Sequence, residues 1–161
     1  MANPYAWDRR LGEALRRAVG RVPGGVRAGR MVSGAMEPAF QALVAAMLVR
    51  PDARPAGVRA LVGGAAASTL ARVVRDAVGR PRPGDRRDAG FPSRHAAAAV
   101  AIARAAGRRH RSLRPWLACA SIVGLAARVA AAEHDPADIA AGALIGLSVD
   151  GLLDHVLGRG A

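Results

Sequence analysis

Six stretches with helical periodicity, separated by short breaks rich in proline, glycine or arginine, constrain the fold of this 161-residue chain more than any other feature. Signals for strands, such as alternation of apolar and polar residues, are essentially missing from the sequence. The length fits one compact domain. The expected helices span residues 7–22, 31–49, 60–74, 93–107, 115–132 and 136–157. The sequence therefore predicts an all-α fold, a compact bundle of about five short helices preceded by a separate N-terminal helix.

The five later segments are apolar enough to suggest membrane helices, although none offers the roughly 20 uninterrupted apolar residues expected of a membrane span. Glu37-Pro38 interrupts segment 31–49, and segment 93–107 is especially short. Segment 60–74 is rich in small residues, which let helices approach closely in lipid. A soluble bundle is the alternative, but the third, fifth and sixth segments lack the wide polar faces that it needs. We therefore expect an integral, multi-pass protein of the cell membrane.

The first segment is a basic amphipathic helix. Apolar residues recur at steps of three and four, and arginines take the positions between them. Such a helix suits either a membrane interface rich in anionic lipid or a groove on a partner protein. Trp7 favours the interface, because an indole near the helix start can anchor there. We expect residues 1–30 to form this N-terminal segment and residues 31–161 to form the main helical domain.

The chain carries a formal charge of +12, and all 24 of its basic residues are arginine. A composition rich in arginine, alanine and glycine usually reflects a GC-rich genome, so the lack of lysine is not in itself functional. The charge implies an anionic partner: a membrane surface, a phosphorylated substrate or nucleic acid. Aromatic residues make up 3% of the chain, too few to stack bases, so we expect no nucleic-acid partner. The single cysteine, Cys119, excludes an intramolecular disulfide and is expected in the core.

The stretch from Arg128 to Asp138 has the residues of a histidine nucleophile, with His134 between them at the seam of two apolar segments. Pro136 suits the first turn of a helix and Asp135 can cap it, so Asp138 falls close to the imidazole. A carboxylate that holds one ring nitrogen frees the other to attack, and a nearby arginine neutralises an anionic substrate. The same residues also fit an ordinary helix start with acidic side chains at its positive end.

Two further groups of residues suit a phosphate site. Ser93 is a good N-cap, and the free backbone N–H groups behind it form an anion site beside His95, which can donate a proton to a leaving oxygen. Arg75 and Arg82-Pro83 flank a stiff turn and can clamp phosphate oxygens by paired hydrogen bonds. Alone, the first group also fits a capped helix with a solvated histidine, and the second fits a charged loop at a membrane surface.

The order of the segments predicts a common location for these three groups. If consecutive helices alternate in direction, the third segment ends, the fourth starts, the fifth ends and the sixth starts on one side of the molecule. All three groups fall at these four ends, whereas His110 and His155 fall on the opposite side. One joint phosphate site is therefore a stronger hypothesis than any of its parts.

The three groups also resemble, in order, the three-part pattern of a known family. They read Arg75-x6-Arg82-Pro83, Pro92-Ser93-Arg94-His95 and Arg128-x5-His134-x3-Asp138. This pattern resembles that of the type 2 phosphatidic acid phosphatase superfamily, which contains lipid phosphate phosphatases, bacterial acid phosphatases and vanadium haloperoxidases. The resemblance covers residues 60–157. Three positions depart from the usual pattern: Arg75 replaces a common lysine, Arg94 a common glycine, and Ala127 a serine that often precedes the arginine.

The resemblance implies a membrane phosphatase that hydrolyses a lipid-linked phosphate monoester or diphosphate. By this resemblance His134 attacks phosphorus to form a phosphohistidine and Asp138 orients it. His95 then protonates the leaving alcohol and activates the water. The residues expected to hold the phosphoryl oxygens are Arg75, Arg82, Ser93, Arg94 and Arg128. No metal and no other cofactor are implied, which agrees with the few carboxylates expected near the site.

The resemblance also indicates classes of substrate. These are polyprenyl phosphates or diphosphates, phosphorylated polyprenyl-linked sugars, and glycerophospholipid monophosphates. Compact members from GC-rich bacteria resemble enzymes of polyprenyl-linked cell-wall precursor metabolism, so decaprenylphosphoryl-5-phosphoribose is the first substrate that we expect. Two alternatives stay open. One is a non-catalytic basic membrane protein that binds anionic lipid or scaffolds a partner, and the other is a haloperoxidase-like protein that holds vanadate.

Overall fold

The computed structural model describes residues 5–83 and 88–157, and these ranges contain helices, one isolated β-bridge and no strand. The helices are α1 (Ala6–Gly20), α2 (Gly25–Val49), α3 (Arg54–Val78), α4 (Arg94–Arg109), the short 3-10 helix η1 (Arg111–Leu113), α5 (Arg114–Ala130) and α6 (Pro136–Leu157). The all-α prediction is therefore confirmed. The expected N-terminal segment (residues 1–30) and main domain (residues 31–161) include some residues that lie outside the described ranges. These are residues 1–4, 84–87 and 158–161.

Two of the helices are longer than the sequence predicted. Helix α2 starts at Gly25, directly after Gly24 in the left-handed conformation, and continues through Pro38. Glu37-Pro38 interrupts the apolar run of this helix but not the helix itself. Helix α3 starts at Arg54, with a proline in its first turn. A proline at this position costs no hydrogen bond, because the N–H groups of the first turn have no partner within the helix. The last helix, α6, has the bounds that the sequence predicted.

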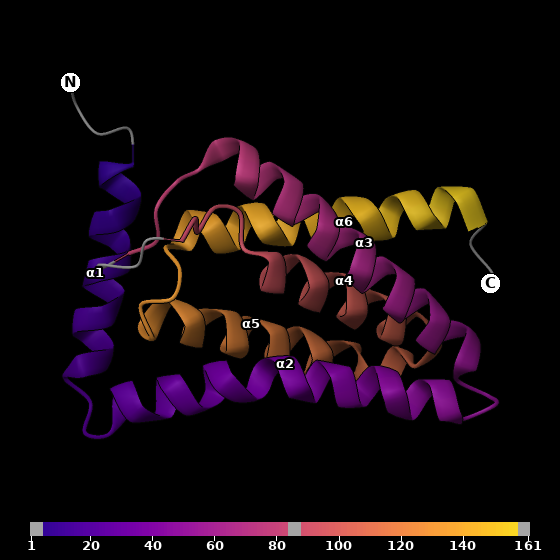
Figure 1. Cartoon of the computed structure of the whole chain (residues 1–161). Coiled ribbons are helices and arrows are strands. Elements are labelled where there is room, and N and C mark those ends of the chain that lie inside the picture. Colours follow the sequence, from indigo (N-terminus) through magenta and orange to yellow (C-terminus); the bar gives the residue numbers. More distant parts are fainter. Residues whose placement is uncertain (1–4, 84–87, 158–161) are drawn as a thin grey trace.

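Helices α2 to α6 lie side by side, and α1 runs across one end of this bundle (Figure 1). Helix α4 is at the centre, packed against α2, α3, α5 and α6. Four helical stretches are long and apolar enough to cross a membrane: α2, α3, η1 with α5, and α6. Helix α4 has 16 residues, which makes it about 24 Å long and shorter than the roughly 30 Å of a bilayer's hydrocarbon core.

Small residues fill the inside of the bundle, and many large apolar ones face outward. The buried side of α4 consists of Ala96, Ala97, Ala99, Ala101, Ala105, Ala106 and Gly107. Leu70, Ile122 and Leu144 are exposed, as expected where lipid rather than water surrounds the protein. Cys119 is exposed on α5, so its expected place in the core was wrong. A cysteine side chain suits both the core and an exposed apolar surface, and only the packing of α5 distinguishes these two positions.

Two glycines of α6 allow its close contact with α4. A Cβ added at Gly142 would overlap the carbonyl oxygen of Ser93, and one added at Gly146 would overlap that of Ala97. At Gly151, farther along the same helix, a Cβ would meet nothing within 4 Å. Gly142 and Gly146 therefore set the distance between α6 and α4.

We expect Gly146→Ala to lower the thermal unfolding temperature, because the new methyl group forces α6 away from α4 at a cost of about 1–3 kcal/mol. Gly151→Ala is the matched control, since its methyl group enters open space. Thermal unfolding of the detergent-solubilised protein measures both variants. Equal unfolding temperatures for the two variants would contradict this account of the α4–α6 contact.

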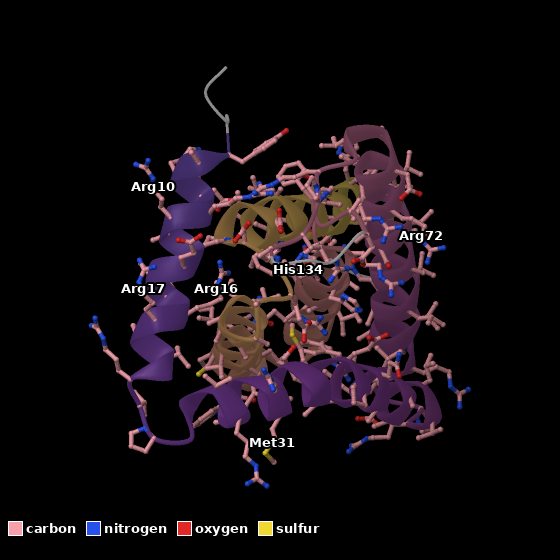
Figure 2. The ribbon with its side chains drawn as sticks, turned by 60° about the vertical axis from the view of Figure 1, so that its left-hand side comes forward. Arg10, Arg16, Arg17, Met31, Arg72 and His134 are labelled. Atoms are coloured by element: carbon pink, nitrogen blue, oxygen red, sulfur yellow. The ribbon has the colours of Figure 1, made fainter. Side chains whose placement is uncertain are left out.

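The side of α1 that faces the bundle is polar. Asp8 and Gly12 are buried on this side, and Arg16 points from it toward the bundle in Figure 2, whereas Arg10 and Arg17 point away. Ion pairs of Asp8 and Arg16 connect α1 to the bundle.

The apolar residues of α1 instead form an outward stripe. Trp7, Leu11 and Leu15 are exposed, and Val22 just beyond the helix is exposed as well. An outward apolar stripe beside exposed arginines is what a helix lying in a membrane interface requires. The interfacial placement of α1 therefore stays our prediction.

Candidate active site

The three groups of candidate residues meet at the end of the bundle that α1 covers. The C-terminal ends of α3 and α5 and the N-terminal ends of α4 and α6 lie together at this end (Figure 1). His134, in the connection between α5 and α6, lies in the middle of this end, between α1 and α3 (Figure 2). Alternation of helix direction therefore placed the groups at one end, as the order of the segments predicted.

His134 lies between a hydroxyl group and a carboxylate. Its Nε2 is 3.2 Å from Ser93 Oγ, and its Nδ1 is 3.4 Å from Asp138 Oδ2. The ring is only 1% exposed. Asp138 is fixed in turn, since its Oδ2 accepts a hydrogen bond of 2.9 Å from the backbone N–H of Asp135. Asp138 thus lies beside Nδ1 without making a hydrogen bond to it, while Nε2 faces the N-terminus of α4.

The N-terminus of α4 has the geometry of an anion site. Ser93 caps it, with Oγ accepting a hydrogen bond from the Ala96 N–H at 3.3 Å. The Ser93 N–H donates to the Asp138 carbonyl at 2.9 Å, which ties α4 to the first turn of α6. Arg94 is the first residue of the helix, and its buried Nε has no hydrogen-bond partner. Free donors and the positive end of a helix dipole therefore lie next to His134.

His95 lies in the same first turn of α4 and borders a cavity of about 160 Å³ between α2, α3 and α4. Its Nε2 is 3.0 Å from Glu37 Oε2, and its Nδ1 is 3.4 Å from Arg128 Nη1. Arg94 and Arg128 line the cavity as well. The two candidate histidines thus flank one helix terminus, with arginines beside both.

Arg128, the arginine of the third group, is already paired with a carboxylate of the protein. Arg128 Nη1 donates to Glu133 Oε2 at 2.7 Å, and Ser33 Oγ donates to Glu133 Oε1 at the same distance. Arg128 is 5% exposed, and its Nε has no hydrogen-bond partner. An anion is therefore already bound where the sequence predicted that arginine would hold one.

The structure separates the two arginines of the remaining group. Arg82 reaches the site, because its Nη1 donates to the Glu133 carbonyl at 3.2 Å, next to His134. The guanidinium of Arg75 instead pairs with Asp76 on the same helix, at 2.9 Å. The structure therefore brings together His134, Asp138, Ser93, Arg94, His95, Arg128 and Arg82, and it turns Arg75 toward Asp76.

Arg80 is one of the residues of this site that the sequence did not reveal. It is 3% exposed and faces three buried carboxylates. Its Nη2 pairs with Asp8 and lies 3.2 Å from Asp135 Oδ2, and its Nη1 lies 3.4 Å from Asp138 Oδ1. One guanidinium thus connects α1, the α5–α6 connection and the carboxylate beside His134.

The partners of Arg80 extend this connection. Tyr5 lies under its guanidinium, 4.5 Å from ring centroid to Cζ. Asp8 Oδ1 accepts a hydrogen bond of 2.9 Å from the Ala137 N–H in the first turn of α6. Burial raises the pKa of the Asp135 carboxyl above its usual range, and the Asp8 carboxylate nearby adds to this effect. The position of Arg80 inside the Arg75-x6-Arg82 spacing was the available signal, but only the tertiary structure supplies its partners.

Carboxylates are more numerous here than the sequence indicated, but arginine or histidine side chains engage them. Glu37 pairs with His95, Glu133 with Arg128, and Arg80 holds the aspartates described above. Within residues 5–83 and 88–157, no group of three or more acidic, histidine or cysteine side chains is arranged to hold a metal ion.

Comparison with known proteins identifies the fold. No protein-family model and no curated protein matches the sequence. The chain is similar to the crystal structure of a transmembrane PAP2-type phosphatidylglycerolphosphate phosphatase from Bacillus subtilis. The two are 17% identical with a TM-score of 0.73, over 97% of this chain and 89% of the other. Together with four helical stretches able to cross a bilayer, this makes the chain an integral, multi-pass membrane protein with the fold of the type 2 phosphatidic acid phosphatases.

Proposed function

We propose that the protein is a membrane phosphatase that hydrolyses a lipid-linked phosphate through a phosphohistidine at His134. The placement of His134 supports this most directly. Its Nε2 faces the N-terminus of α4, and Asp138 lies at Nδ1. Three arginines gather around the same helix terminus: Arg82, Arg94 and Arg128. The fold of a transmembrane phosphatase agrees with this proposal.

In the first step, His134 attacks the phosphorus of the substrate. Asp138 keeps the proton on Nδ1, so the lone pair of Nε2 is free to form the N–P bond. The P–O bond to the lipid alcohol breaks, and His95 donates a proton to that oxygen. Glu37, 3.0 Å from His95 Nε2, orients the ring. Water activated by His95 then attacks phosphorus and releases phosphate and His134.

The phosphoryl oxygens bind where the Glu133 carboxylate now lies. A phosphate entering the site displaces Glu133 from Arg128 and gains the bonds that this carboxylate makes at 2.7 Å. Arg82, Arg94, the Ser93 hydroxyl and the free N–H groups of α4 complete the set and stabilise the charge of the transition state. Arg75 joins them only by leaving Asp76.

The substrate is a lipid that enters from the membrane beside α2 and α3. The cavity next to His95 is lined by apolar residues of α2 and α4, among them Met36, Phe40 and Ile102, which suit an acyl or prenyl chain better than a soluble alcohol. Decaprenylphosphoryl-5-phosphoribose is the first candidate. Phosphatidylglycerolphosphate is the second, because the structurally similar Bacillus subtilis protein is a phosphatidylglycerolphosphate phosphatase.

Phosphate release in neutral detergent tests this function. We expect lipid phosphates to be hydrolysed at least about tenfold more efficiently than p-nitrophenyl phosphate, because the apolar cavity binds the tail. We expect EDTA to leave the rate unchanged and vanadate to inhibit it, since a histidine nucleophile needs no metal and vanadate mimics the five-coordinate phosphorus. Activity that EDTA removes would contradict the histidine mechanism. A wild type inactive on all these substrates would favour the non-catalytic scaffold, and bromide oxidation with added vanadate would favour the haloperoxidase-like protein.

A further inference from the structure

A second group of arginines lines a polar cavity of about 280 Å³ at the other end of the bundle, far from α1. The arginines are Arg59, Arg108, Arg109, Arg111 and Arg114. The acidic residues of the lining are Asp52 and Asp154. The lining therefore has an excess of three positive charges, which is unfavourable unless an anion compensates it.

Three of these arginines make no ion pair with a described residue, although Arg109 is near enough to Asp52 to interact with its charge. Arg108 pairs with Asp150 and Asp154, and Arg59 pairs with Asp154 at 2.8 Å. Arg109 and Arg114 donate through Nε to the backbone carbonyls of Asp52 and Gly107, at 3.2 and 2.8 Å. In the part of the chain that the structure describes, Arg109, Arg111 and Arg114 make no ion pair. Their terminal nitrogens are therefore available to a ligand.

Other unused donors lie at the same cavity. Arg59 is 6% exposed, and its Nε has no hydrogen-bond partner. Helices α3 and α5 both start at this end, and neither has a side-chain cap or an acidic residue in its first turn. Helix N-termini of this kind attract anions. Several independent features at this end thus favour a negatively charged ligand.

An apolar groove of about 600 Å³ between α4, α5 and α6 adjoins the polar cavity. The two share Arg108 and Arg114 as lining residues. The larger apolar side chains of the groove are Val100, Leu117, Ile122, Leu125 and Leu147. A polar cavity rich in arginine next to an apolar groove matches a molecule with an anionic head and a hydrocarbon chain.

We propose that this end of the bundle binds an anionic glycerophospholipid, with the phosphate among Arg109, Arg111 and Arg114 and one acyl chain in the groove. A zwitterionic phosphatidylcholine fits less well, because its ammonium group adds positive charge to a lining that already has an excess. Phosphatidylglycerol is the suitable probe, since it has a phosphodiester and no phosphate monoester. It is therefore no substrate of the proposed phosphatase, and this site stands apart from His134.

Thermal unfolding of the full chain in neutral detergent, with added lipid, tests the proposal. We expect phosphatidylglycerol to raise the unfolding temperature, and phosphatidylcholine with the same acyl chains to raise it much less. The variant Arg109→Gln/Arg111→Gln should need at least about tenfold more phosphatidylglycerol for the same shift, because each arginine near a phosphate contributes about a factor of five. The matched control is Arg27→Gln/Arg72→Gln, which removes two exposed arginines elsewhere.

Three results would overturn the proposal. Equal stabilisation by the two lipids would show that the negative charge of the headgroup is not recognised. An equal loss of response in the control variant would show that overall charge, rather than this cavity, attracts the lipid. Stabilisation by soluble glycerophosphoglycerol, the headgroup phosphodiester without acyl chains, as large as that by the lipid, would show that the cavity binds the headgroup alone and that the groove has no part.

Discussion

Replacing His134 with asparagine is expected to abolish phosphate release, with a fall in kcat of at least about ten-thousand-fold. The asparagine side chain can occupy part of the space of the ring and can bond to Ser93, but it has no nitrogen able to attack phosphorus. Because the residue removed is the nucleophile itself, this is the largest effect that we predict. Phosphate release from a lipid phosphate in detergent measures it.

His155→Asn is the matched control for this substitution. His155 is exposed on α6, near the end of the bundle that lies opposite His134, so its replacement should leave kcat unchanged. Since His134 is buried, the unfolding temperature of the His134→Asn protein must also be measured. A folded His134→Asn protein that keeps more than about one hundredth of the wild-type rate would contradict the role of this histidine.

Arg80→Gln is the second substitution with a large expected effect. Removing the guanidinium leaves three buried carboxylates, those of Asp8, Asp135 and Asp138, without their shared partner. Removing one partner of a buried ion pair typically costs about 3–5 kcal/mol. We also expect kcat to fall by about a hundredfold, because Asp138 is no longer held against His134. Thermal unfolding and steady-state kinetics measure the two effects.

The kinetics separate a positioning role of Arg80 from direct substrate binding. Arg80 contacts carboxylates rather than the cavity, so kcat should fall while KM changes little. The double variant Asp8→Asn/Arg80→Gln should recover part of the stability, since it removes a carboxylate together with its partner. Arg72→Gln, at an exposed position of α3 (Figure 2), is the control and should behave as the wild type. A rise in KM without a fall in kcat would contradict the positioning role.

The all-α bundle could be predicted from the sequence because its breaks are chemically explicit. Pro136 starts α6, Gly24 precedes α2, and Gly79 ends α3 in the left-handed conformation. Alternation of helix direction then places the ends of α3 and α5 beside the starts of α4 and α6. The residues of the candidate site are brought together for the same reason, since they lie at those ends.

Features that depend on packing could not be predicted in this way. Helix α2 starts at Gly25, six residues before the expected start at residue 31. The periodicity of α1 identifies an apolar face but not that this face points away from the bundle. Glu133 and Arg80 acquire their partners from distant segments, Ser33 and Asp8 among them. Charge alone could not identify either residue, because many other residues of the chain carry the same charge.

Chemical trapping of the phosphorylated enzyme tests the central claim most directly. The variant His95→Gln should accumulate the intermediate, because the group that activates water is absent while the nucleophile remains. After rapid quenching with alkali, which preserves phosphohistidine, mass spectrometry of the labelled protein should place one phosphoryl group on His134. Phosphate release at the wild-type rate with no phosphoryl group on His134, or a label on another residue, would contradict a mechanism built on this histidine.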